Sequence, residues 1–168
     1  MSEDTVKIGI VTAEESGDLL ADEFIKALSL SNKKVQIYGL VGEKLRHMIN
    51  EAPTEVDRTV FNVMGLIDPF LNLQKILGER KKLLNYFLKQ NIDIFIGVDS
   101  PDLNLYFHKN LKNKQDVMNI QLVSPSVWGW RPKRINLLKK YVDLTLCLFK
   151  FEHQHLSLIH ISEPTRQD

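Results

Sequence analysis

The sequence predicts an α/β fold, a Rossmann-like parallel sheet with helices on both faces. Short segments rich in Val, Ile and Leu alternate with amphipathic segments whose apolar residues recur at helical spacing. The length of 168 residues, with 43% hydrophobic and 26% charged content, is ordinary for one globular domain. In a sheet of this kind ligands bind beyond the carboxyl ends of the strands. Functional residues are therefore expected in the loops that follow the apolar segments.

The first half of the chain predicts three strands. Residues 6–11 are rich in β-branched side chains, residues 35–38 form a second strand-like segment, and residues 55–60 form a third. A helix over about 17–30 separates the first two strands. Its apolar side chains follow the spacing i, i+4, i+7 and i+8, as Leu20, Phe24, Ala27 and Leu28. A short helix is expected just before the third strand.

The second half predicts strands and helices in alternation. A long amphipathic helix over 73–88 places the segment Glu79–Lys82 on its solvated side. Pro132 suits the first position of the last helix. The strands are expected at 92–98, 118–123 and 143–148, and the helices between them near 102–112 and 132–140.

Composition excludes several classes of function. The net charge of +1 argues against a chain that wraps nucleic acid by bulk electrostatics. The single cysteine, Cys147, excludes an intramolecular disulfide, and no apolar run approaches the roughly 20 residues of a membrane span. The histidines lack metal-ligand spacing, so no metal site is predicted. No cofactor is expected either. We expect the protein in the reducing cytoplasm.

Two loops have compositions that core packing does not require. Gly97–Asn104 follows an apolar strand pattern and contains Asp99 and Asp102. The segment Val123–Arg131 combines two serines, two tryptophans and an arginine: Ser124, Ser126, Trp128, Trp130 and Arg131. Indole rings supply flat apolar walls, and a guanidinium suits phosphate. Because both loops follow strands, they predict one ligand cleft.

A third loop, Thr12–Asp18, follows the first strand. Ser16, Gly17 and Asp18 either cap the next helix or let backbone N–H groups face an anion or a sugar hydroxyl. The loop lacks the three-glycine dinucleotide fingerprint and a phosphate-loop lysine, which argues against NAD and nucleoside triphosphates. Taken alone, this loop favours the capping interpretation.

Together these loops resemble the N-terminal half of the lipid-A-disaccharide synthase family. The resemblance covers residues 6–152 and rests on five motifs: Glu14–Asp18, Val63–Leu66, Ile96–Leu105, Val123–Arg131 and Leu148–Glu152. The chain departs from the family pattern at Ala13, Glu15 and Lys150. Because Glu15 lies beside Glu14, either carboxylate is a candidate for the one that points into the cleft.

The resemblance implies an inverting glycosyltransferase of the two-Rossmann-domain (GT-B) class. The family joins UDP-2,3-diacylglucosamine to 2,3-diacylglucosamine 1-phosphate, which gives the lipid A disaccharide precursor and UDP. The N-terminal domain of such an enzyme receives the acceptor, and the C-terminal domain holds most of the donor. Residues 1–155 are therefore expected to be the acceptor side alone, a fragment inactive without the donor half. A homodimer is one option for the full-length protein.

The same resemblance assigns the general base, which takes the proton from the acceptor 6-hydroxyl, to Asp99, with Glu14 as the next candidate. A loop-capping aspartate before Pro101 is the alternative for Asp99. Asp102 is better explained as a cap of the helix after it, and the basic residues from Arg131 onward have a solvated helix face as their alternative. Substrate contacts are implied for Ser16, Gly17, Asp102, Asn104, Ser124, Ser126, Trp128, Trp130 and Arg131.

Residues 63–71 hold clustered apolar side chains without clean periodicity, beside a helix that displays lysines and an arginine. This arrangement fits an acyl-chain contact or a membrane-surface contact. The family resemblance implies that this surface is the cytoplasmic face of the inner membrane. The candidates for this contact are Met64, Leu66, Ile67, Phe70 and Leu71. A buried connection between a strand and a helix is the alternative.

The last residues, 156–168, resemble a translated sequencing adapter. They are expected to be an artefactual tail, with the real protein continuing past residue 155. Two other functions stay open: a sugar-nucleotide epimerase of the same two-domain architecture, and a non-enzymatic flavodoxin-like binding module. The Trp128–Arg131 loop fits the epimerase poorly, and the module would be complete in one domain.

Overall fold

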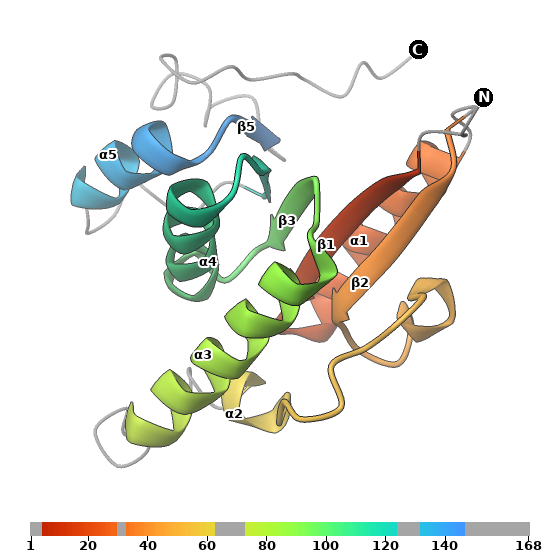
Figure 1. The fold of residues 1–168 in the computed structure, drawn as a ribbon, viewed down its shortest axis with the longest axis horizontal. Helices are drawn as coiled ribbons and strands as arrows, with labels where there is room; N and C mark the ends of the chain where they lie inside the picture. The colour runs from red at the N-terminus through yellow and green to blue at the C-terminus, as the bar shows by residue number, and fades with distance from the viewer. Residues whose placement is uncertain (1–4, 30–32, 63–72, 124–131, 147–168) are drawn as a thin grey trace.

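The computed structural model of the chain describes residues 5–29, 33–62, 73–123 and 132–146. Within these residues the centre is a five-stranded, parallel sheet with the strand order β2-β1-β3-β4-β5 (Figure 1). The predicted parallel α/β architecture is confirmed. The strands are β1 (Val6–Thr12), β2 (Val35–Leu40), β3 (Ile94–Val98), β4 (Met118–Leu122) and β5 (Leu144–Leu146).

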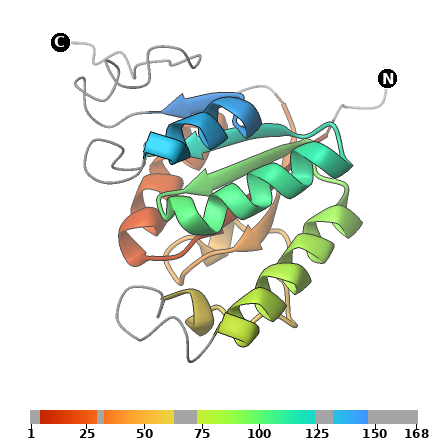
Figure 2. The ribbon, with the colours of Figure 1, turned by 90° about the vertical axis from the view of Figure 1, so that its left-hand side faces the viewer.

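Helices cover both faces of the sheet, as the sequence predicts (Figure 2). The helix α1 (Glu15–Ser29) lies on one face. Among the described residues, α3 (Leu73–Gln90), α4 (Pro101–Lys114) and α5 (Pro132–Tyr141) lie on the other face. Two short segments, η1 (Arg46–Met48) and α2 (Thr59–Asn62), lie in the connection between β2 and α3.

Each face of the sheet has its own apolar core, because side chains alternate between the faces along every strand. Ile8 of β1 packs with Ile25 of α1 in the first core. In the second core Phe87, Phe95 and Phe107 form a cluster with ring centroids between 5.5 and 6.1 Å apart. Burial on both sides explains why the strands read as nearly continuous apolar runs.

The strand order changes direction between β1 and β3, since β2 lies on the outer side of β1 and β4 lies on the outer side of β3. The strands β1 and β3 are paired, with Thr12 opposite Val98 at their carboxyl ends. The loop after β1 leads to α1 on one face, whereas the loop after β3 leads to α4 on the other. The place where two such loops diverge is called the topological switch point. In open α/β sheets, ligands bind there.

The prediction of a third strand at residues 55–60 is wrong. The helix α2 begins at Thr59, whose backbone N–H donates to the Asp57 carboxylate at 3.0 Å, which suits a helix start. In the described chain, pairing on the outer side of β2 is limited to a parallel bridge from Glu51 to Tyr38. If this bridge counts as a strand, the order becomes the 3-2-1-4-5-6 of the Rossmann fold.

The expectation that Glu79–Lys82 faces solvent is wrong for its first half. Glu79 is buried and accepts hydrogen bonds from the backbone N–H of Asp57 at 2.9 Å and from Lys82 at 2.8 Å. Arg80 lies over the ring of Tyr106, with Cζ 5.7 Å from the ring centroid. These contacts fix α3 to the loop before α2 and to α4.

Candidate functional site

The loop between β3 and α4 has an unusual backbone. Asp99 has φ 48° and Ser100 has φ 35°, in the left-handed region that non-glycine residues rarely adopt. Val123, directly after β4, has φ 70°. Each such residue costs on the order of 1–3 kcal/mol and persists only where its surroundings hold it. This combination, at the carboxyl ends of two neighbouring strands, points to a functional site.

Asn104 holds the loop from the side of α4. Its side chain is fully buried, and its Nδ2 donates to the carbonyl oxygens of Val98 at 3.2 Å and Asp99 at 2.6 Å. Gly97 makes this close approach possible, since a Cβ there would lie only 2.7 Å from Asn104 Cβ. The sugar contact predicted for Asn104 stays a prediction, while the structure shows an amide engaged by the loop itself.

Gln121 of β4 binds the same loop from the side of the sheet. Its Nε2 donates to the carbonyl oxygens of Asp99 at 3.0 Å and Val123 at 3.2 Å, with that of Leu122 at 3.3 Å. Its Oε1 lies 3.0 Å from Nε2 of His108, a fully buried residue of α4. Burial lowers the pKa of His108, so its imidazole is neutral at neutral pH. Because Gln121 offers an oxygen, Nε2 of His108 carries the proton and donates it.

A second buried group lies where β1 and β2 end. The Asp18 side chain is 1% exposed and accepts hydrogen bonds from the Thr12 hydroxyl and from the backbone N–H of Gly42 at 2.8 Å. Arg58 approaches its other oxygen at 3.4 Å. A side chain on Gly42 would overlap the carboxylate, with its Cβ 1.7 Å from Asp18 Oδ2. Asp18 therefore ties the start of α1 to the loops after β1 and β2.

The capping interpretations of Ser16, Asp18 and Asp102 are wrong. The helix α1 begins at Glu15, so Ser16 and Asp18 lie within its first turn, and Asp18 points to the neighbouring loops instead. The residue before α4 is Ser100, which makes no side-chain cap, and Asp102 lies exposed in the first turn of that helix. An acidic residue there still complements the helix dipole.

The predicted site residues that the structure describes gather at the carboxyl edge. Glu14 and Ser16 are exposed, Gly17 is buried, and Asp99 is half-buried. Their contacts with substrate stay predictions. The remaining candidates lie outside the described residues: Ser124, Ser126, Trp128, Trp130, Arg131, Met64, Leu66, Ile67, Phe70 and Leu71, as does Cys147.

Sequence reasoning missed Arg58, His108 and Gln121. A signal for Gln121 exists in the run Met118–Leu122, where polar and apolar residues alternate. In a sheet with one wet face, this pattern marks exposed positions. In a parallel sheet covered on both faces it marks buried amides, which need partners.

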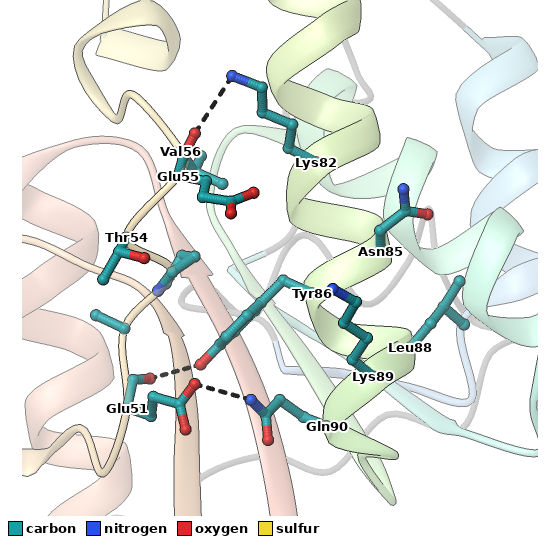
Figure 3. A pocket seen from close by; sticks show the side chains of 12 residues that line it. Glu51, Thr54, Glu55, Val56, Lys82, Asn85, Tyr86, Leu88, Lys89 and Gln90 are labelled. Atoms are coloured by element: carbon teal, nitrogen blue, oxygen red, sulfur yellow. Dashed lines mark hydrogen bonds between the residues drawn. The ribbon is translucent and has the colours of Figure 1, made fainter.

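A separate hollow of about 670 Å³ lies outside this edge, between α3 and residues 51–56 (Figure 3). Tyr86 donates from its hydroxyl to the Glu51 carbonyl at 2.8 Å, and Gln90 Nε2 donates to the Glu51 carboxylate at 3.0 Å. None of the predicted site residues that the structure describes lines this hollow. The geometry therefore favours the carboxyl edge as the functional site.

Two searches of the described residues bear on the class of protein. No group of three or more His, Cys, Asp and Glu side chains there is placed to hold a metal ion. No helix in the described ranges combines the length and apolar character needed to cross a membrane.

Comparison with known proteins decides the family. A model of the lipid-A-disaccharide synthetase family matches residues 8–158. The chain belongs to this family. It corresponds to the N-terminal region of lipid-A-disaccharide synthases. This match favours the synthase over the epimerase and the flavodoxin-like module.

Individual relatives agree with this assignment. The lipid-A-disaccharide synthase of Blochmanniella floridana is 39% identical over 148 residues, which are 88% of this chain and 38% of that protein. That of Pseudoalteromonas translucida is 38% identical over 149 residues, 89% of this chain and 38% of that protein. The chain thus spans 38% of the length of these relatives.

The fold has a counterpart among solved structures. The crystal structure of a glycosyltransferase from Rickettsia africae ESF-5 matches with a TM-score of 0.53 and 17% sequence identity. The match covers 99% of this chain and 44% of the other. At this identity it supports the fold alone.

Proposed function

We propose that the full-length protein joins UDP-2,3-diacylglucosamine to 2,3-diacylglucosamine 1-phosphate, forming the lipid A disaccharide precursor and UDP. Family membership over residues 8–158 supports the proposal. In this GT-B arrangement, residues 1–155 form the acceptor side, and a second Rossmann domain beyond them holds most of the donor.

The observation that carries the proposed chemistry is the placement of Asp99. It follows β3 directly at the switch point, is half-buried, and is held by two buried amides in a backbone conformation that costs free energy. In the proposed reaction the acceptor 6-hydroxyl attacks the anomeric carbon of the donor and passes its proton to the Asp99 carboxylate. The bond from the anomeric carbon to the UDP phosphate breaks as the new glycosidic bond forms, with inversion.

Replacing Asp99 tests the role of the base. In the full-length enzyme, Asp99→Asn should lower kcat by about 10² to 10⁴, because an amide cannot take the proton. Acceptor binding should change little, since the side chain keeps its size. Disaccharide formation from the two diacylated substrates measures both effects.

Asp116→Asn serves as the control, since Asp116 is exposed just before β4, at the opposite edge of the sheet. Near-normal turnover of Asp99→Asn would move the base elsewhere, and Glu14 would be tested next.

We further propose that the enzyme meets its lipid substrates as a peripheral protein at the cytoplasmic face of the inner membrane. The first turns of α3 support this, because Leu73 and Leu77 are each 48% exposed. Lys75 and Lys81 are exposed on the same helix. Apolar insertion combined with basic attraction is how amphipathic segments bind anionic bilayers.

Phe70→Ser with Leu71→Ser tests the membrane contact. Binding of the protein to vesicles that contain anionic lipid should weaken by about tenfold or more, because each apolar side chain contributes about 1.5–3 kcal/mol when buried. The thermal midpoint should stay nearly unchanged. Leu19→Ser is the matched control, since Leu19 is 51% exposed on α1, on the other side of the sheet. A large loss of stability with unchanged vesicle binding would place Phe70 and Leu71 in the core.

A further inference from the structure

We propose that Gln121 and His108 are positioning residues that hold Asp99 in place for proton transfer, acting through the Asp99 backbone. The inference deepens the proposed function and rests on it. In the proposed mechanism neither side chain contacts the substrate. Gln121 holds the loop, and His108 fixes the direction in which Gln121 points.

The geometry of Gln121 links two strained residues through one amide group. Its Nε2 lies 3.0 Å from the Asp99 carbonyl oxygen and 3.2 Å from that of Val123. Both of these residues have positive φ, and each begins the loop after its strand. Val123 immediately precedes the segment 124–131, in which the sugar-contacting residues are predicted. One buried amide therefore sets the proposed base relative to the start of the predicted sugar-binding loop.

His108 decides the orientation of that amide. A glutamine amide has a donor end and an acceptor end, and only the donor end suits two carbonyl oxygens. The neutral imidazole donates from Nε2 to Gln121 Oε1 at 3.0 Å, which directs the Gln121 NH₂ group toward the loop. The His108 ring is itself fixed, edge-on to Phe95 with a centroid distance of 5.1 Å. Without this donor, Gln121 Oε1 would lose its hydrogen bond, and the amide would lose one of the contacts that fix its orientation.

Asn119 provides an internal comparison. It lies two residues before Gln121 on β4, on the same face, and is equally buried. Its Nδ2 likewise donates to backbone carbonyl oxygens, those of His108 at 3.2 Å and Tyr141 at 3.0 Å. Neither partner has a positive φ, and neither lies in the loop after β3. Asn119 thus has the burial of Gln121 and a similar kind of bonding, and although it contacts His108, these bonds reach neither Gln121 nor Asp99.

This pair gives a matched test in the full-length enzyme. Gln121→Met and Asn119→Leu both keep approximate side-chain size and remove a buried amide. We expect Gln121→Met to lower kcat by about 10- to 100-fold, with both KM values within about twofold, because a displaced base slows the reaction more than binding. Asn119→Leu should keep kcat within about threefold of the wild type at a temperature where both variants are folded. Equal kcat values for the two variants would overturn the proposal.

His108 is tested by removal and rescue. His108→Phe keeps an aromatic ring beside Phe95 but removes the donor, and should lower kcat. His108→Gln supplies an amide donor and should recover part of that loss. Because His108 acts through Gln121, the double variant His108→Phe/Gln121→Met should have a kcat no lower than that of Gln121→Met alone. Additive losses would show that His108 does not act through Gln121. If Gln121→Met fails to fold, the two His108 variants decide the question.

The Asp99→Asn background separates the two proposals. If Gln121 acts through the base, adding Gln121→Met to Asp99→Asn should cause little further loss of kcat. A wild-type enzyme that forms no disaccharide overturns the proposed function and the positioning role with it. An active wild type with a fully active Gln121→Met variant overturns the positioning role alone.

Discussion

His108 makes the stability of the folded chain depend on pH through a single side chain. It is fully buried between α4 and the sheet, and burial lowers its pKa from the usual 6.5. Hydrogen bonds to Gln121 and Asn119 and the negative charge of Asp143 act in the opposite direction but are weaker. The folded chain therefore keeps a neutral imidazole at pH values where the unfolded chain is already protonated.

We expect the free energy of unfolding to fall as the pH falls below about 6.5. In that range the unfolded chain binds a proton that the folded chain does not, so each pH unit costs up to about 1.4 kcal/mol. Urea unfolding between about pH 5.5 and 8 measures this slope. His108→Phe should unfold more easily at all pH values but with a flatter slope. An unchanged slope would assign the acid sensitivity to another group.

At the scale of single residues, the sequence predicts the place of Asp99 but not what holds it. The apolar segment before Asp99 and the polar loop after it are both visible in the chain. Its partners Asn104 and Gln121 come from α4 and β4, and only the packing of these elements brings them together. Side chains that donate hydrogen bonds to backbone carbonyls form no recognisable sequence motif, because the carbonyl of any residue can accept such a bond.

At the scale of elements, the Asp18 carboxylate joins four parts of the chain that apolar packing alone would leave loosely connected. It binds the end of β1 through Thr12, the loop after β2 through Gly42 and the segment before α2 through Arg58, while belonging to α1 itself. The Arg58 side chain is 25% exposed, so part of its charge remains in contact with water. The loop positions near the switch point depend on this connection.

Asp18→Ala should destabilise the chain by several kcal/mol, because each buried donor left without a partner costs about 1–3 kcal/mol. Gly42→Ala should also destabilise it, since the new Cβ overlaps the carboxylate. Urea unfolding with circular dichroism measures both. Glu43→Ala is the control, since its 90% exposed side chain pairs only at the surface with Arg46 and should change stability by less than about 1 kcal/mol. A stable Asp18→Ala variant would show that the carboxylate costs as much to bury as it contributes.

Helices and strands are predictable where a regular pattern of apolar residues extends over many positions. The helix α3 and the strands β1, β3 and β4 follow directly from their patterns. The error at 55–60 has a physical cause, because Asp57 binds the backbone of Thr59 and starts a helix in a segment that would otherwise suit a strand. Local hydrogen bonds of this kind compete with sheet pairing and are not read from hydropathy.

At the scale of the whole molecule, the purified chain should not transfer sugar at a detectable rate. Under the proposed arrangement the donor half is missing, and with it the binding energy that stabilises the transition state. Incubation with both substrates, followed by mass spectrometry of the lipid products, tests this, with the full-length enzyme as the positive control. Disaccharide synthesis by the chain alone would contradict the two-domain arrangement.

The architecture as a whole is more predictable than its strand order. Alternating strands and helices predict a parallel sheet covered on both faces, because parallel strands need crossover connections. The order β2-β1-β3-β4-β5 depends on which face each crossover takes, and hydropathy is the same for both choices. The sequence therefore predicts the parallel sheet but not its strand order.

The central position of β1 determines when the sheet can be completed. The backbone of Lys7 binds the Asp93 carboxylate across a separation of 86 residues, and every pair between β1 and β3 spans a similar length of chain. Closing such a loop costs conformational entropy before any contact repays it, so sheets of this kind form slowly. During synthesis, the edge of β1 that pairs with β3 has no partner until Val98 has left the ribosome. An apolar strand with an open edge is a template for aggregation. The opening segment of the chain is therefore the part with the greatest need of a chaperone.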